Sequence, residues 1–116
     1  MNQAGTHLIA DLYGCSGLDD AALIEDTLRA AVLAIGATLI GLHLHPFGEG
    51  QGITGVAMLA ESHMSIHSWP ETGYAAIDIF VCGTGQDLDQ GLAIIAQALN
   101  AERQEIHSIR RGIPHK

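Results

Sequence analysis

Basic residues are scarce in this sequence of 116 residues. It has five of them, against thirteen aspartates and glutamates, which gives a formal net charge of −8. This deficit argues against a protein that neutralises a nucleic-acid backbone, and it favours small cationic partners. The only lysine is the last residue, Lys116. The absence of an internal lysine argues strongly against chemistry that needs a lysine Schiff base, such as that of pyridoxal phosphate.

Long apolar runs and a secretory signal are also absent. No segment has the length and apolar purity of a membrane-spanning helix. Residues 1–5 lack the charged region and apolar stretch that begin a signal peptide. Cysteine is limited to Cys15 and Cys82, far apart and outside any CxxC motif, so we expect two free thiols. These absences predict a cytoplasmic protein with no membrane partner.

The residues that are present are typical of one folded domain spanning residues 1–116. Apolar residues make up 47% of the chain and charged residues 16%, which argues against a disordered chain. Apolar patterns predict strands at 7–13, 38–44, 53–60, 63–69, 75–82 and 103–109. One helix is expected to begin after Asp19 or Asp20 and end at Gly36, and a second to begin after Asp87. Their apolar stripes are Ile24, Leu28, Ala31 and Ile35, and Leu88, Leu92, Ile95 and Leu99.

The order of these elements predicts an α+β fold. Strand, helix, four strands, helix and strand favour an antiparallel sheet with two helices packed on one face. The strands are apolar on both sides, so the other face must be covered as well. We expect a subunit interface there.

Histidines are frequent, with seven in the chain. His43 and His45 would share one face of a strand, as would His63 and His67. With Cys82 nearby, these pairs offer a zinc site as an alternative function. Neither pair has a recognised ligand spacing, so we expect no metal site.

Two further motifs are weak. The Gly83-Thr84-Gly85 segment before the second helix is half of a phosphate loop, but a lone GxG is better explained as a turn. Ser62, Ser65 and Ser68 lack the GxSxG context of a hydrolase nucleophile, so a conventional catalytic triad is not expected.

The segment around residue 62 is much more specific. It contains Glu61-Ser62-His63, then an Ile-His-Ser-Trp-Pro-Glu run at 66–71, Gly-Tyr-Ala-Ala-Ile-Asp at 73–78 and Cys-Gly at 82–83. The opening segment 5–15 and the Gly-Ala-Thr at 36–38 fit the same pattern. Together they resemble the bacterial and archaeal class of S-adenosylmethionine decarboxylases, from about residue 5 to residue 112.

The resemblance implies a proenzyme that cuts its own backbone between Glu61 and Ser62. The products would be a β chain of residues 1–61 and an α chain of residues 62–116, headed by a covalent pyruvoyl group made from Ser62. The family assigns the proton-accepting role in this reaction to the position of His67. Thr54 stands where the family often has a serine that assists the acyl shift. His67 is five positions after Ser62, an odd offset that would put the two side chains on opposite faces of a regular strand. We therefore expect Ser62 at a turn or strand end, or an intervening bulge.

The resemblance also implies the second reaction, decarboxylation of S-adenosylmethionine for spermidine biosynthesis. The pyruvoyl group would form a Schiff base with the substrate amine, and Cys82 would donate the proton that replaces CO₂. Phe47 matches the residue that stacks on adenine, and Glu71 the residue that holds the ribose. The family usually forms a homodimer of αβ protomers with the active sites at the interface.

Two other readings remain open at this point. A decarboxylase of the same family acting on arginine or ornithine would keep the processing motif and change the pocket. A member that is not processed would be a regulatory or metal-binding protein, although the presence of Ser62, His67 and Cys82 argues against it.

Overall fold

The structure is a computed structural model that describes residues 4–82 and 85–113. These residues form six strands and two helices in the predicted order, whereas Gly83 and Thr84 of the glycine motif lie outside the described residues. The elements are β1 (Gly5–Tyr13), α1 (Ala21–Ile35), β2 (Leu39–Pro46), β3 (Ile53–Leu59), β4 (Ser62–Trp69), β5 (Tyr74–Cys82), α2 (Leu88–Ala98) and β6 (Arg103–Arg111).

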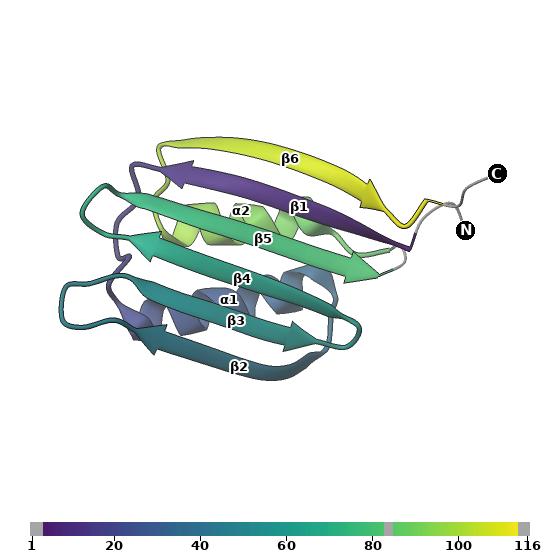
Figure 1. Ribbon diagram of the computed structural model, residues 1–116, viewed down its shortest axis with the longest axis horizontal. Helices are drawn as coiled ribbons and strands as arrows, with labels where there is room; N and C mark the ends of the chain where they lie inside the picture. The colour runs from purple at the N-terminus through teal and green to yellow at the C-terminus, as the bar shows by residue number, and fades with distance from the viewer. Residues whose placement is uncertain (1–3, 83–84, 114–116) are drawn as a thin grey trace.

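The strands form one sheet in the order β2-β3-β4-β5-β1-β6, and every neighbouring pair is antiparallel. Consecutive strands from β2 to β5 are neighbours, as expected for short hairpin connections. The first strand does not follow this order of neighbours, because β1 lies between β5 and β6 (Figure 1). The predicted α+β class with an antiparallel sheet is confirmed.

Local signals set the helix ends. The Asp20 side chain accepts a hydrogen bond from the backbone N–H of Leu23 at 3.1 Å, and Asp87 caps α2 in the same way. Gly36 ends α1 with φ +79°, a left-handed conformation that glycine adopts without a steric penalty. Of the two predicted caps for α1, Asp20 is therefore the one used.

Both helices pack on one face of the sheet, with α1 behind the β3 side and α2 behind β5 and β1 (Figure 1). Their apolar stripes meet the apolar residues that alternate along the strands, and the core lies between these two layers. Seven of the eight predicted stripe residues are buried, and Leu88 packs at the margin of the core. The prediction of two helices on one face is confirmed.

The opposite face of the sheet carries no described element, and we call it the open face. Several apolar side chains on it remain accessible. They are Ile9 (37% exposed), Val56 (38%), Met58 (58%), Trp69 (42%) and Ile109 (45%). In the described ranges, no helix has the length and apolar character needed to cross a membrane.

Candidate active site

The tight turn between β3 and β4 contains the predicted cleavage site. Leu59 pairs with Ser62, so the connection consists of only Ala60 and Glu61. Glu61 has φ +62°, and it is one of two non-glycine residues with positive φ in the described ranges. This conformation costs a residue with a side chain about 1–2 kcal/mol. Ser62 is the first residue of β4, so the prediction that it lies at a turn or strand end is confirmed.

Cys82 contacts both sides of the Glu61–Ser62 bond from the end of β5. Its thiol donates a hydrogen bond to the carbonyl oxygen of Glu61, with 2.7 Å between the sulfur and the oxygen. Its backbone N–H donates to the Ser62 hydroxyl at 3.3 Å. The turn therefore places a hydroxyl beside a carbonyl that already accepts a hydrogen bond. We call Glu61, Ser62 and Cys82 the cleavage group.

Four other predicted residues gather at the opposite end of β4. Thr54 and His67 are cross-strand neighbours, and the Thr54 hydroxyl lies 3.2 Å from Nδ1 of His67. Both line a pocket of about 320 Å³ that also includes Phe47, Trp69 and Glu71. We call Phe47, Thr54, His67 and Glu71 the pocket group.

The two groups are far apart within one chain. Ser62 and His67 lie five residues apart on the same strand, a separation of about 16 Å at 3.3 Å per residue. The Ser62 hydroxyl therefore cannot reach the His67 imidazole of its own chain. Within one chain, the predicted site residues therefore form two separate groups at opposite ends of β4.

A third cluster, which the sequence did not predict, lies on the open face between these groups. Nε2 of His7 is 2.8 Å from Oδ2 of Asp78, and Nε2 of His63 is 3.2 Å from the same oxygen. The Ser65 hydroxyl hydrogen bonds to the other carboxylate oxygen. Burial alone would raise the pKa of Asp78, but the hydrogen bonds from Ser65, His7 and His63 together lower it. We call His7, His63 and Asp78 the histidine cluster.

Alternation along each strand indicates that His7, His63 and Asp78 lie on the same face of the sheet, but finding the cluster also requires the register between the strands. Asp78 pairs with Ile9 on one side and with Ser65 on the other, while His7 and His63 both pair with Phe80. Neither register is readable from the spacing of residues in the sequence. The histidine pairs considered above do not converge on Cys82, because His63 bonds to Asp78 and His67 to Thr54.

Aromatic side chains form a row on the open face where β4 and β1 end and β5 begins. The ring of Tyr74 stacks on Trp69 at 5.1 Å and on Tyr13 at 5.4 Å between centroids. The guanidinium of Arg103 lies 4.0 Å from the centre of the Tyr13 ring. The Tyr74 hydroxyl donates to the Asp11 carboxylate, and this bond is the main reason that its pKa rises to about 12.

Ser68, the third serine of the run, has a structural position. It is 6% exposed, and its hydroxyl donates to the carbonyl of Leu18 at 2.7 Å. The same oxygen accepts the backbone N–H of Ile53 at 2.9 Å. The Ser68 hydroxyl therefore links the backbone at Leu18 to the backbone at Ile53.

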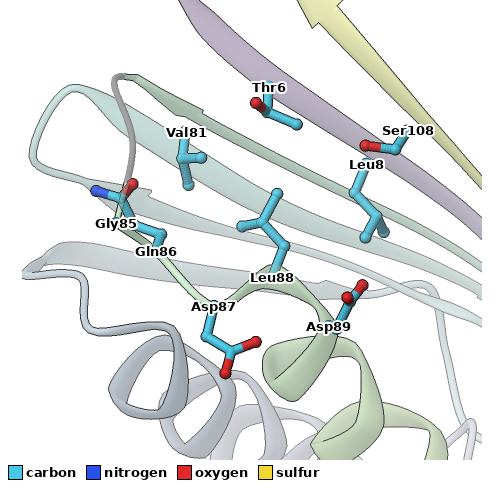
Figure 2. Close-up of a pocket in the computed structure, with 9 residues that line it drawn as sticks. All are labelled: Thr6, Leu8, Val81, Gly85, Gln86, Asp87, Leu88, Asp89 and Ser108. Atoms are coloured by element: carbon cyan, nitrogen blue, oxygen red, sulfur yellow. The ribbon is translucent and has the colours of Figure 1, made fainter.

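Another pocket, of about 330 Å³, lies on the helix side of the sheet (Figure 2). Leu8 and Val81 from the strands and Leu88 from α2 line it, with Asp87 and Asp89 at the start of the helix. None of the predicted site residues lines this pocket. It lies across the sheet from the side chains of Thr54 and His67 in the pocket group.

Known proteins resemble this chain over nearly its whole length. The family model for S-adenosylmethionine decarboxylase matches residues 6–112. The chain is 49% identical over 115 residues to the S-adenosylmethionine decarboxylase proenzyme of Methanococcus maripaludis (strain DSM 14266), covering 97% of this chain and 93% of the relative. It is 47% identical over 112 residues to the proenzyme of Parasynechococcus marenigrum (strain WH8102), covering 95% and 87%.

A solved structure has the same fold. The crystal structure of the adenosylmethionine decarboxylase from Aquifex aeolicus VF5 superposes with a TM-score of 0.89 at 35% sequence identity. The match covers all of this chain and 97% of that one. The chain therefore belongs to the S-adenosylmethionine decarboxylase family.

Proposed function

We propose that the protein is a self-processing, pyruvoyl-dependent decarboxylase of S-adenosylmethionine, whose product serves spermidine biosynthesis. The observation that carries the proposal is the strained turn at Glu61, whose carbonyl oxygen is held by the Cys82 thiol beside the Ser62 hydroxyl. Membership of the family indicates S-adenosylmethionine as the substrate, and its relatives are named as proenzymes, which supports self-processing.

The first reaction is cleavage of the chain at the turn. The Ser62 oxygen attacks the Glu61 carbonyl carbon, and the C–N bond breaks as the amide becomes an ester. A base then removes the Cα proton of Ser62, and the Cβ–O bond breaks to release residues 1–61 with a free Glu61 carboxylate. The dehydroalanine left at position 62 takes up water and loses ammonia to become the pyruvoyl group.

The Cys82 thiol supports the first step of this cleavage. Charge develops on the Glu61 carbonyl oxygen as Ser62 attacks, and a donor already aimed at that oxygen stabilises the charge. The left-handed backbone of Glu61 adds strain that opening of the peptide bond relieves.

The base must come from a second copy of the chain. His67 is about 16 Å from Ser62 of its own chain, but a two-fold axis near the middle of β4 would bring each Ser62 opposite the partner copy's histidine. The exposed apolar residues of the open face support such a pairing. We therefore propose a homodimer of αβ protomers in which Thr54 and His67 of one copy complete the cleavage group of the other.

The residues around position 62 fit the pyruvoyl group. In the uncut chain the Cys82 N–H donates to the Ser62 hydroxyl and the Cys82 thiol donates to the Glu61 carbonyl, so Cys82 would lie next to the group made from residue 62. The group supplies a ketone that withdraws electrons from the substrate's α-carbon. From that position the Cys82 thiol would donate the proton that replaces CO₂ on the substrate.

The pocket group fits an adenosyl substrate better than arginine or ornithine. Phe47 is 62% exposed and offers an aromatic face for adenine, with Trp69 lining the same pocket. The Glu71 carboxylate can accept hydrogen bonds from ribose hydroxyls. The sulfonium of the substrate is cationic, which the acidic chain suits.

Denaturing electrophoresis and CO₂ release test the proposal together. We expect two bands, with the 62–116 band blocked at its amino terminus and labelled by borohydride. Carboxyl-labelled S-adenosylmethionine should release CO₂, and labelled arginine and ornithine should not. The Ser62→Ala variant should remain one inactive band. A wild-type chain that stays uncut and takes up no borohydride label would refute the proposal.

A further inference from the structure

We propose that His7, His63 and Asp78 form a binding site for a divalent transition metal of the zinc type on the open face of the sheet. The three residues come from β1, β4 and β5, and their ligand atoms lie within 4.8 Å of one another. This inference is independent of the proposed function, and it departs from the expectation that the chain binds no metal.

The donor set is the first argument for the site. Two imidazole nitrogens and one carboxylate oxygen are ligands that zinc accepts, and a site with three protein ligands leaves a fourth position open. A pocket of about 320 Å³ lined by His7, Ser65, His67 and Asp78 lies in front of the cluster, with room for a water or another ligand there.

The spacing of the donors is the second argument. Oδ2 of Asp78 is 2.8 Å from Nε2 of His7 and 3.2 Å from Nε2 of His63. A tetrahedral zinc with bonds of about 2.0–2.1 Å separates its ligand atoms by about 3.3 Å. Both distances to Oδ2 therefore lie within about 0.5 Å of the spacing that zinc requires, and the two histidine nitrogens lie within 4.8 Å of each other.

The surroundings of Asp78 are the third argument. Ser65 holds Oδ1 of the carboxylate, so Oδ2 is left to face both histidines. The ring of His63 stacks on Phe80 at 5.9 Å, and the ring of His7 meets Phe80 edge-on at 5.7 Å. A hydrogen bond to a ligating carboxylate, such as the one from Ser65, orients metal ligands in known sites.

Arg111 acts against metal binding. Its Nη1 lies 3.5 Å from Nδ1 of His7, and because a guanidinium only donates hydrogen bonds, this contact places the His7 proton on Nε2. A metal at Nε2 requires the proton to move to Nδ1, where it faces the guanidinium. Replacement of Arg111 by glutamine supplies an amide oxygen that can accept this proton, so Arg111→Gln should bind metal more tightly than the wild type.

Titration with Co²⁺ tests the site, because tetrahedral Co²⁺ absorbs strongly in the visible. We expect untagged, metal-free protein to bind one Co²⁺ per chain and to release it when one equivalent of Zn²⁺ is added. His63→Gln and Asp78→Asn should weaken binding about tenfold or more. The matched control is His43→Gln, which lies in the same cross-strand row as Asp78 but three strands away, at about 14 Å.

Three outcomes would overturn the proposal. They are the absence of a visible band in the wild type, an equal loss in His43→Gln and His63→Gln, or an Arg111→Gln affinity no higher than that of the wild type. If Asp78→Asn fails to fold, His63→Gln decides alone, because the His63 side chain is 45% exposed. Repeating the titration in Ser62→Ala, which cannot be cut at Ser62, separates metal binding from the proposed processing.

Discussion

A single buried hydroxyl ties the start of β3 to the loop before α1. The Ser68 oxygen accepts the N–H of Ile53 and donates to the carbonyl of Leu18, so its removal leaves two buried polar groups without partners. Ser68→Ala should therefore lower the free energy of unfolding by about 1–3 kcal/mol.

Urea unfolding of uncut Ser62→Ala protein measures this effect. The matched control is Ser108→Ala on the exposed strand β6, which should change stability by less than about 0.5 kcal/mol. Equal effects at the two serines would contradict the role given to Ser68.

Tyr74 provides a residue-scale prediction that depends on pH. Its hydroxyl donates to the Asp11 carboxylate, so loss of the phenol proton would place two negative charges together, and its pKa is raised to about 12. This pKa lies above the ordinary value of 10.0. The contribution to stability is complete below pH 10 and is lost as the pH rises through 12.

Ultraviolet titration in a Tyr13→Phe background follows Tyr74 alone, since the chain has two tyrosines. We expect a midpoint near 12, and a lower midpoint when Asp11→Asn is added, because burial is then the main remaining cause of the raised pKa. An unchanged midpoint in the Asp11→Asn protein would show that another cause raises the pKa.

At the scale of elements, Gly91 controls how closely the two helices approach. A Cβ built at this position of α2 would lie 2.4 Å from Cγ2 of Ile35 in α1. Gly91→Ala gains about 1 kcal/mol of helix propensity but forces the helices apart at a cost of about 1–3 kcal/mol. We expect a net loss of stability, measured by urea unfolding.

The control for this change is Gly41→Ala in β2, where a Cβ meets no atom within 4 Å. In an Ile35→Ala background the clash is gone, so Gly91→Ala should become stabilising there. A loss at Gly91 that persists in this background would contradict the helix-contact argument.

The elements themselves were largely predictable because their signals are local. Alternation, an Asp20 or Asp87 cap and Gly36 each act within a few residues, so the predicted bounds of the strands differ from the structure by about two residues at most. The ladder formed with neighbouring strands causes the differences. For example, β6 continues to Arg111 because Arg111 still pairs with Gly5 of β1.

The site was predictable only in part. The sequence motif identified Ser62, His67 and Cys82 as site residues, but it did not indicate which of these side chains lie in contact. Cys82 reaches the Glu61 turn because β4 and β5 are in register, and His67 lies at the far end of β4 for the same reason. The bond between His7 and Asp78 joins residues 71 positions apart, which only the folded sheet brings together.

At the scale of the whole molecule, the proposed pairing of two copies predicts complementation. Ser62→Ala and His67→Ala chains should each be inactive alone. Co-expression in one cell forms mixed pairs in which the His67→Ala chain supplies Ser62 and Cys82, and the other chain supplies the histidine. Random pairing then gives activity of about a quarter of the wild-type level.

Cys82→Ala provides the matched control for this experiment. Ser62 and Cys82 belong to the same cleavage group, so co-expressed Ser62→Ala and Cys82→Ala chains cannot assemble one complete site. Decarboxylation should not return in that mixture. Rescue in both mixtures, or in neither, would refute a site shared between copies in the proposed way.

The position of β1 has a further consequence for a molecule cut after Glu61. The piece 1–61 contains β1, and the piece 62–116 contains both of its neighbours, β5 and β6. The two pieces are interwoven, and they part only when three strand ladders break together. An uncut chain can refold as a unimolecular reaction, whereas separated pieces must first meet by diffusion. In dilute solution the lifetime of the cut molecule is therefore set by its rate of unfolding, because refolding depends on concentration.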